Sequence, residues 1–384
     1  MKILINVCLC LMLVACNKVD DYLLGVDNTP TPNALKALVA QKKVTKKWQI
    51  AAGESSKKQH LKIKPVVLGQ IVYTASTTGR VQATNRFTGQ VIWSTNIRAN
   101  ILSGPSVAGH LLVVGTGSSS IVALNSNTGH IIWQKTLSSD ALAKPVIYHH
   151  KVIVKTINGF IYALEASTGK KIWQVKHGAP SLILKASSSP VMMKDNIMLV
   201  GFSDGKIDAI DISTGQLIWQ RSIAYGTGAS DIEKLVSIDA NPIVEHDTVW
   251  LATYQGYIAA LSLKTGQYKW RHPASTFLNL AVFGQNLLMV DSRDVIWSIN
   301  KYTGNINWQQ KQLKARGLTE PVLMGNKLIV GDKTGLVHII SAENGQFLAR
   351  LQLDSAVSYP VSTLGHTMYV MTSKGQLNCF VVSK

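Results

Sequence analysis

The chain has 384 residues, of which 46% are hydrophobic, 7% aromatic and 16% charged, and 39 Lys+Arg against 21 Asp+Glu give it a net charge of +18. A chain this apolar is not disordered, and its length suffices for one large domain or two or three ordinary ones. The small charged fraction excludes a coiled coil. Abundant Gly, Ser, Thr and Val favour β structure, so the composition predicts an all-β protein.

The N-terminus has the pattern of a secretory signal. Lys2 precedes an apolar run, Ile3 to Val14, which is too short to span a bilayer as a permanent helix. Leu13-Val14-Ala15-Cys16 resembles a bacterial lipobox, in which cleavage before the cysteine frees its amine and the thiol carries the lipid. We therefore predict a signal peptide over 1–15. The alternative is an ordinary signal peptide in which Cys16 is incidental.

Cys16 is the predicted lipidation site, where acyl chains such as palmitate would anchor the protein. The following Asn17, in place of Asp, resembles lipoproteins that are sorted to the outer membrane. The location expected is therefore the periplasmic face of the outer membrane. Residues 16–43, with Thr29-Pro30-Thr31-Pro32, are predicted to form the lipidated cysteine and a flexible tether.

Cysteine usage offers no disulfide and no zinc site. Cys8 and Cys10 leave with the signal and Cys16 would be acylated, so Cys379 stands alone. Cys379 lies within the apolar stretch Leu377 to Val382, which indicates a buried structural thiol rather than a nucleophile. No spacing of ligands suits a metal, so we predict none.

A repeat of 40 to 50 residues organises the rest of the chain, in the range of propeller blades. Each unit has a Thr-Gly pair, or Asn-Gly in the last, and in every unit but the last a Trp follows four residues later. The pairs end at Gly89, Gly129, Gly169, Gly215, Gly266, Gly304 and Gly345. The residues four positions on are Trp93, Trp133, Trp173, Trp219, Trp270, Trp308 and Ala349. We expect each ring to fill the cleft between neighbouring blades.

One unit predicts four antiparallel strands. Asn158-Gly159 and Thr168-Gly169 are turn signals that separate the second, third and fourth strands. The strands are expected over Val146–Tyr148, Val152–Thr156, Phe160–Leu164 and Lys171–Val175. Such a blade has two apolar faces and cannot stand alone, so its neighbours must cover them.

The two ends of the chain complete one another. The last unit, from Pro360, stops before its fourth strand, whereas Val44 to Gln49 precedes the first unit and carries Trp48. We infer that this N-terminal strand completes the C-terminal blade and closes the ring, which removes two exposed sheet edges. The prediction is a single eight-bladed β-propeller over 44–384, made of four-stranded antiparallel blades. A seven-bladed ring would leave Trp48 without a role.

The unit Ala209 to Trp219 resembles the tryptophan-docking repeat of quinoprotein, PQQ-like propellers. One family with this repeat comprises the PQQ-dependent alcohol and glucose dehydrogenases. That resemblance implies a calcium-binding carboxylate, a catalytic Asp and an adjacent Cys pair, none of which can be assembled here. Asp204 and Asp211 fall on turn positions of the repeat. We therefore predict no cofactor, no catalytic residue and no enzyme.

A second family matches more specifically. Pro180 to Lys185 is similar to the Pro-Ser-Leu-x-Leu-Arg segment of the BamB family, the lipoprotein propellers of the β-barrel assembly machinery. Thr227 to Leu235, followed by Asp239 to Pro242, is similar to that family's Thr-Gly-x-x-Glu-Ile-Asp-Arg-Leu segment and the Asp-x-Asp-x-x-Pro after it. This resemblance implies a scaffold that assists folding and insertion of outer-membrane proteins.

The connections between blades point to the same region independently. The gap from docking residue to next proline is about twelve residues in most units, but 17 from Trp173 to Pro190 and 23 from Trp219 to Pro242. Equivalent connections emerge on one face, so these two consecutive segments are expected to form one raised patch. Long loops on a rigid scaffold are a usual place for function.

By resemblance, this patch binds the periplasmic POTRA domains of BamA. The positions that match the family's contacts are Leu182, Leu184, Lys185, Ser237 and Asp239. Two of them depart from the family pattern. Lys185 replaces Arg and offers no bidentate fork, and Ser237 takes the place of the first Asp.

The positive charge remains compatible with several partners. Secretion argues against nucleic acid, and the basic residues are spread along the chain without an aromatic-interleaved stripe. One interpretation is a solvated basic surface with no specific partner, and the functional alternative is attraction to anionic lipid beside the anchor. Two alternative functions are also open: a PQQ-dependent dehydrogenase-like quinoprotein, and a direct binder of unfolded, nascent outer-membrane proteins by edge pairing.

Overall fold

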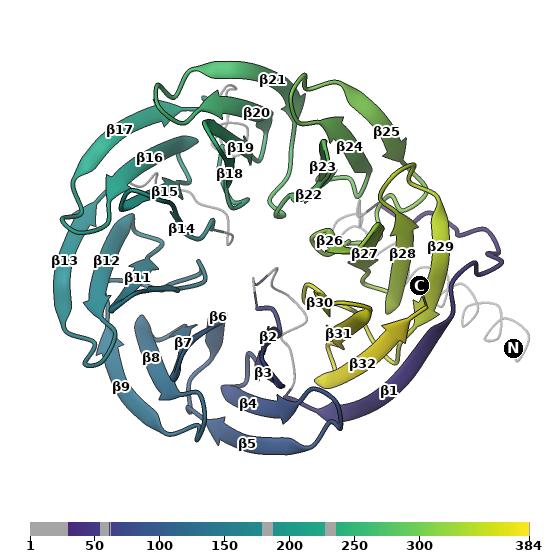
Figure 1. Ribbon diagram of the computed structural model, residues 1–384, viewed down its shortest axis with the longest axis horizontal. Coiled ribbons are helices and arrows are strands. Elements are labelled where there is room, and N and C mark those ends of the chain that lie inside the picture. Colours follow the sequence, from purple (N-terminus) through teal and green to yellow (C-terminus); the bar gives the residue numbers. More distant parts are fainter. Residues whose placement is uncertain (1–29, 54–60, 62, 179–186, 227–235, 384) are drawn as a thin grey trace, which may run out of the picture.

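The computed structural model describes residues 30–53, 61, 63–178, 187–226 and 236–383. These residues form eight four-stranded antiparallel sheets arranged radially in a ring (Figure 1). Figure 1 looks down the axis of the ring, with the first strand of each blade near the centre and the fourth at the rim. The predicted all-β, eight-bladed β-propeller is confirmed.

Blades 1 to 4 follow one another in chain order, each with four consecutive strands paired in sequence. Their strands are β2 (Val66–Leu68), β3 (Ile71–Ala75), β4 (Arg80–Asn85) and β5 (Val91–Asn96); β6 (Ile101–Ala108), β7 (Leu111–Thr116), β8 (Ser120–Asn125) and β9 (Ile131–Thr136); β10 (Val146–Tyr148), β11 (Lys151–Lys155), β12 (Phe160–Glu165) and β13 (Lys171–Lys176); β14 (Val191–Met192), β15 (Ile197–Gly201), β16 (Lys206–Asp211) and β17 (Leu217–Ser222).

Blades 5 to 8 complete the circle, and blade 8 is the one that joins the two ends of the chain. Their strands are β18 (Ile243–Glu245), β19 (Thr248–Ala252), β20 (Gly256–Ser262) and β21 (Tyr268–Ala274); β22 (Ala281–Phe283), β23 (Asn286–Val290), β24 (Ile296–Asn300) and β25 (Ile306–Gln310); β26 (Val322–Met324), β27 (Lys327–Gly331), β28 (Leu336–Ser341) and β29 (Phe347–Gln352); β30 (Ser362–Leu364), β31 (Thr367–Met371), β32 (Gln376–Val382) and β1 (Val44–Ala51).

Blade 8 closes the ring as predicted. Strand β1 pairs antiparallel with β32, from Val44 opposite Val382 to Ala51 opposite Gln376. Trp48 on β1 is buried and its indole lies against Gly89 of blade 1. The N-terminal strand therefore completes the last sheet and supplies the docking ring for the next blade. The outer side of β32 is therefore paired with β1 and is not an exposed sheet edge.

Blade 3 matches the prediction made from its sequence to within one residue at each strand end. The turn from β11 to β12 places Gly159 at a φ of +83°, and the turn from β12 to β13 places Gly169 at +69°. Only glycine takes such backbone angles without strain, which explains why it recurs at these positions. The inner strands are buried on both faces, because each blade packs between two others.

The docking rings seal the seams between blades. A Cβ atom built on the turn glycine of the next blade would meet the indole at 2.5 to 2.9 Å, so glycine is required there. The pairs are Trp48 with Gly89, Trp93 with Gly129, Trp133 with Gly169, Trp173 with Gly215, Trp270 with Gly304 and Trp308 with Gly345. At Gly266, Arg221 makes the nearest contacts in place of Trp219, because its guanidinium donates to the Thr265 carbonyl.

Residues 30–43 have no regular secondary structure, yet they contact the propeller. Asn33 N donates to the Lys314 carbonyl at 3.1 Å, and Gln41 N donates to the Leu348 carbonyl at 2.7 Å. Figure 1 shows this part of the chain running beside β29 at the rim of blade 7. We call residues 30–43 the strap. Within the part of the chain that the structure describes, no helix is long and apolar enough to cross a membrane.

Candidate functional site

Four of the six predicted lipidation and partner-binding residues fall on residues 1–29 and 179–186. Cys16, Leu182, Leu184 and Lys185 therefore lie outside the described residues. Ser237 and Asp239 are described, and both are about 1% exposed. Ser237 Oγ donates to Asp239 Oδ1 at 2.8 Å. These two side chains hold the chain where it returns from segment 227–235, and they do so from inside the fold.

The described residues on either side of segment 179–186 lie on one small cluster between blades 3 and 4. On its N-terminal side, the His177 ring stacks on Phe202 with centroids 3.7 Å apart and planes 8° from parallel. On its C-terminal side, Ser188 Oγ donates to the Gly201 carbonyl at 3.0 Å. The Lys155 ammonium donates to the carbonyls of Ser188 and Gly201. Both ends of the segment are thus fixed to the same strand end of β15.

The return of segment 227–235 reaches the same cluster. Ile238 N donates to the Phe202 carbonyl at 3.0 Å. Ser237 forms an antiparallel bridge with Tyr254, whose amide donates to the Ser237 carbonyl at 2.8 Å. Phe202 therefore contacts His177 through its ring and Ile238 through its carbonyl. The two segments share one support although about fifty residues separate them in sequence.

A direct hydrogen bond joins the two returns. Ser189 N donates to Asn241 Oδ1 at 2.7 Å, and Asn241 N donates in turn to Asn279 Oδ1 at 2.8 Å. Ser189 and Asn241 each precede the recurring proline of their blade, Pro190 and Pro242. We call the described residues at both ends of the two segments, 177–178, 187–190, 223–226 and 236–242, the loop base.

An ionised network stabilises the loop base. His177 Nδ1 lies 2.7 Å from Asp208 Oδ2, and His177 Nε2 lies 3.0 Å from Asp204 Oδ2. Burial alone would lower the pKa of His177, but the hydrogen bonds and charges of the two carboxylates outweigh it and raise that pKa to about 9. His177 is therefore a cation at neutral pH.

The pKa of Asp204 shifts in the opposite direction. Burial favours the neutral form of Asp204, but hydrogen bonds and charges from His177 and Lys206 lower its pKa to about 2. Lys206 Nζ lies 2.8 Å from Asp204 Oδ2. The cations His177 and Lys206 and the carboxylates Asp204 and Asp208 therefore balance one another in this network. Its charges are paired, as buried ions require.

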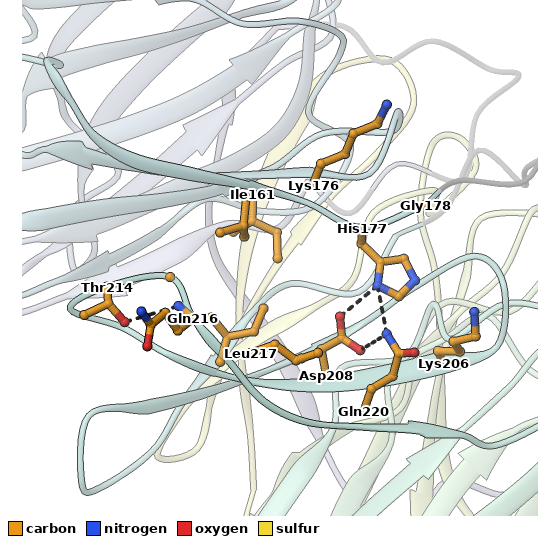
Figure 2. A pocket seen from close by; sticks show the side chains of 13 residues that line it. Ile161, Lys176, His177, Gly178, Lys206, Asp208, Thr214, Gln216, Leu217 and Gln220 are labelled. Atoms are coloured by element: carbon orange, nitrogen blue, oxygen red, sulfur yellow. Dashed lines mark hydrogen bonds and ion pairs between the residues drawn. The ribbon is translucent and has the colours of Figure 1, made fainter.

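A cleft of about 510 Å³ opens on the outer side of the loop base, between β13 and the start of β17 (Figure 2). Figure 2 shows His177, Asp208 and Gln220 joined at one end and Ile161 and Leu217 facing one another beside them. Leu217 is 55% exposed, which is high for a large aliphatic side chain. The cleft thus combines an apolar wall with a polar end, as binding sites commonly do.

The side chain two residues after the docking tryptophan differs between the seams. In two of them it donates to the turn glycine of the next blade: Thr95 Oγ1 to the Gly129 carbonyl at 2.8 Å, and Gln310 Nε2 to the Gly345 carbonyl at 2.8 Å. The equivalent residue beside the cleft is Val175, which has no donor. The turn at Gly215 lies against the apolar side chains of Trp173 and Val175.

No candidate metal site forms among the described residues. No group of three or more His, Cys, Asp or Glu side chains in that part of the chain could hold a metal ion. Asp204 and Asp211 cap turns, as their repeat positions predict, by accepting from the amides of Lys206 and Thr214. Cys379 is 2% exposed, and burial raises its pKa to about 11, so it is a structural thiol as predicted.

The His177 network and the cleft were not predicted from the sequence. Asp204 was interpreted as a turn residue only, and His177 was not singled out. The available signal was a histidine four residues after the docking tryptophan, where the other units have Ile97, Leu137, Ile223, Ala274 and Gln312. Its meaning depends on Asp204 and Asp208 of the next blade, whose proximity the sequence does not reveal.

The geometry defines a propeller of tryptophan-docking repeats in which the described residues of the loop base join blades 3, 4 and 5. A family model described as outer membrane protein assembly factor BamB matches residues 77–310. The chain is 56% identical to outer membrane protein assembly factor BamB of Legionella pneumophila over 98% of both chains, and 39% identical to that of Pseudomonas aeruginosa over 88% of this chain and 89% of the relative. The chain belongs to the BamB family.

Solved structures agree on the fold. The crystal structure of BamB from Moraxella catarrhalis superposes with a TM-score of 0.80 at 28% identity, over 88% of this chain and all of that one. Quinohemoprotein alcohol dehydrogenase from Comamonas testosteroni superposes with a TM-score of 0.73, but at 13% identity over 88% of this chain and 76% of that one. The second likeness shows the propeller architecture alone.

Proposed function

We propose that the protein is a non-enzymatic scaffold lipoprotein of the outer-membrane β-barrel assembly machinery. Membership of a family whose members are named outer membrane protein assembly factors supports this role. A rigid ring that presents two long segments on one support suits a protein that holds a partner in place. In this role it assists the folding and insertion of outer-membrane proteins.

The proposed partner is BamA, bound through its POTRA domains. Leu182 and Leu184 act as apolar anchors and Lys185 as the flanking charge. The burial of Ser237 and Asp239 assigns them a supporting role, in which they fix the segment return that reaches the binding surface. The observation that carries the proposal is the hydrogen bond from Ser189 N to Asn241 Oδ1, which joins the two segments at their base.

Calorimetric titration with purified BamA POTRA domains tests this assignment. The variant carries Leu182→Asp and Leu184→Asp, and the matched control carries Ile131→Asp and Ile132→Asp, two aliphatic side chains that are exposed at the rim of blade 2. Both proteins should keep the circular dichroism of the wild type. The proposal requires lost binding by the first and normal binding by the second. Undiminished binding by the folded first variant refutes it.

The membrane anchor is part of the same proposal. Lipidation of Cys16 would place the ring at the periplasmic face of the outer membrane. Cell fractionation and mass spectrometry of the mature N-terminus test this. A Cys16→Ser variant should lose its acylation and should no longer sediment with the membrane. An unmodified Cys16 in membrane-associated wild-type protein contradicts the assignment.

The enzyme alternative has a direct test. Addition of PQQ and calcium should give no bound chromophore and no dye-linked alcohol oxidation. Either signal would return the protein to the dehydrogenase class.

One structural feature favours a second role, the direct capture of nascent outer-membrane proteins. Among the described residues, the fourth strand of each sheet, such as β13, pairs with a neighbouring strand on one side only. Such an edge can pair with an extended chain. Crosslinking to a nascent porin in the absence of BamA would support capture, and crosslinking only in its presence would argue against it.

A further inference from the structure

One position of the repeat lies two residues before the innermost strand and carries a polar side chain in most blades. The innermost strands stand nearest the axis of the ring (Figure 1), so we call this the axial position. Its polar residues are Lys64, Lys144, Ser189, Asn241, Asn279 and Glu320, which precede β2, β10, β14, β18, β22 and β26. The equivalent residues of blades 2 and 8, Gly104 and Pro360, have no polar side chain.

Polar contacts join five of the axial residues around the ring. Ser189 N donates to Asn241 Oδ1 at 2.7 Å, and Asn241 N donates to Asn279 Oδ1 at 2.8 Å. Asn279 Nδ2 donates to Glu320 Oε2 at 2.6 Å. Lys64 Nζ lies 3.2 Å from Glu320 Oε1, and this ion pair reaches past blade 8. The contacts therefore run from blade 4 through blades 5, 6 and 7 to blade 1.

Lys144 of blade 3 does not take part in these contacts. Its side chain is partly buried, and no hydrogen bond or ion pair joins its ammonium to another described residue. Burial lowers the pKa of Lys144, the charge of Lys64 lowers it further, and the charge of Glu320 raises it. Blades 3 and 7 stand opposite one another in the ring of eight (Figure 1), so the charges of Lys144 and Glu320 interact across the axis.

A second group at the axial position also lacks a partner. Ser189 is 5% exposed, and its hydroxyl makes no hydrogen bond to a described residue. Ser189 follows Lys144 around the ring, and equivalent residues on neighbouring blades, such as Asn241 and Asn279, are close enough to bond directly. A buried hydroxyl or ammonium without an acceptor is costly. One acceptor shared by Lys144 and Ser189 would satisfy both groups.

The charges at the axis define the kind of acceptor. Lys64 and Glu320 neutralise one another as a pair, and Lys144 adds one positive charge. We propose that Lys144 and Ser189, with the charge of Lys64 nearby, bind a small oxyanion, a carboxylate or a phosphate group, at the axis of the ring. An oxyanion accepts from an ammonium and from a hydroxyl alike, and an ammonium imposes no fixed fork that would select one of the two groups. The bound anion joins blade 3 to the contacts that link blades 4 to 1.

This site goes beyond the proposed function, because neither BamA nor the lipid anchor contributes to it. Its ligand contacts come from side chains at the axis, whereas the proposed BamA contacts come from segments 179–186 and 227–235. Absence of anion binding would leave the BamA proposal intact, and absence of BamA binding would leave this site intact. The two proposals therefore fail separately.

An NMR titration of the full chain in a neutral detergent tests the site. The lysines are labelled by reductive ¹³C-methylation, which keeps their positive charge, and the Lys144 signal is assigned by its loss in Lys144→Met. Sodium acetate and sodium phosphate are the probes, and sodium chloride at the same ionic strength is the reference for screening. The test variant is Ser189→Ala, which keeps the backbone amide that donates to Asn241. Its matched control is Ser167→Ala in the exposed turn between β12 and β13.

Acetate, phosphate or both should shift the Lys144 signal saturably, whereas the signal of the exposed Lys170 should follow ionic strength alone. Ser189→Ala should weaken binding at least about fivefold, and Ser167→Ala should leave it unchanged. A response to acetate alone identifies a carboxylate site, and a response to phosphate alone identifies a phosphate site. Three results overturn the proposal: no saturable shift with either probe, the same shift with chloride, or equal affinity in Ser189→Ala.

Thermal unfolding of the unlabelled protein gives a second measurement. Relative to chloride, the effective probe should raise the Tm of the wild type and of Lys170→Met, but not that of Lys144→Met. Lys144→Met should fold normally, because its ammonium makes no hydrogen bond to a described residue. An equal rise of Tm in Lys144→Met overturns the proposal, since the anion would then bind elsewhere.

Discussion

Ser189 and Asn241 lie 52 residues apart in sequence, and the amide of Ser189 donates to Asn241 Oδ1 at 2.7 Å. Each residue precedes the proline that starts its blade, so the bond joins the returns of two interblade segments. An amide side chain can accept here without competing water, because Ser189 is buried. The patch proposed to bind BamA therefore has a common base rather than two separate loops.

Replacing Asn241 with alanine should loosen this base while the ring stays folded. The loss of one buried hydrogen bond costs about 1–3 kcal/mol when its donor is left unsatisfied. Amide hydrogen exchange should therefore become faster at Ser189. Exchange at Ile161 on β12 serves as the internal reference and should not change. Unaltered protection of Ser189 would show that the bond does not hold the returns together.

Stability should depend on pH through His177. Its pKa is about 9 in the folded protein against an ordinary value of 6.5, so its contribution is complete below pH 6.5 and is lost as pH rises through 9. The lost contribution is at most about 3 kcal/mol. Asp204, with a pKa of about 2, contributes above pH 3.8 and loses that contribution as pH falls through 2.

Urea unfolding at several pH values measures this dependence. The wild type should lose stability between pH 7 and pH 10 relative to His177→Gln, whose profile should be flatter in that interval. Parallel profiles for the two proteins would mean that His177 is not the group that titrates. The lysines and tyrosines common to both proteins provide the shared background.

The hydrogen bonds from a blade to the turn glycine of the next blade give two opposite predictions. Thr95→Val removes the hydrogen bond to the Gly129 carbonyl with almost no change of shape, so it should cost about 1 kcal/mol. Val175→Thr places a hydroxyl at the equivalent position beside Gly215 and should stabilise by up to about 1 kcal/mol. Chemical unfolding measures both. Changes of the same sign and size in the free energy of unfolding of the two variants would show that a hydroxyl at this position does not stabilise the contact between blades.

Arg316 should control how firmly the strap is held. Its Nε donates to the fully buried Asp332 at 2.6 Å, and its Nη1 donates to the Asn33 carbonyl at 3.0 Å. Arg316→Met removes both bonds and leaves Asp332 short of a cation, a loss that costs about 3–5 kcal/mol at buried pairs. Trypsin should then cleave after Lys36 faster than in the wild type.

A matched control separates strap release from a general change of charge. Arg293 is 73% exposed and its contact with Asp291 spans 3.5 Å, so Arg293→Met should leave cleavage after Lys36 unchanged. Mass spectrometry of the first fragments decides the question. Equal rates for the two variants would show that Arg316 does not hold the strap.

The repeat made the architecture predictable because each blade carries its own turn and docking residues. Gly159 and Trp173 specify a turn and a seam locally, and Trp48 revealed the closure because it had no unit of its own. Trp219 was assigned the same docking contact, but the neighbouring Arg221 makes the nearest contacts at Gly266. The repeat position predicts that a residue lies at the contact between two blades, but it does not decide which of two nearby side chains packs against the turn glycine.

The site was less predictable because its support comes from pairs that are distant in sequence. The connection lengths singled out two segments, and the described residues at their bases lie together. The burial of Ser237 and Asp239 did not, since the same spacing suits an exposed loop. His177 meets Asp204 and Asp208 only because two blades pack together. The strap meets blade 6 through a hydrogen bond between Asn33 and Lys311, which are 278 residues apart in sequence.

Site-specific photo-crosslinking in living cells tests the central claim most directly. A photoreactive phenylalanine analogue is placed at Leu184 and, as the control, at Ile132 on the rim of blade 2. The account predicts a crosslink between BamA and the protein labelled at Leu184, and none from Ile132. A BamA crosslink from Ile132 but not from Leu184, in proteins present at equal levels, would contradict the assignment of the interblade patch as the BamA-binding surface.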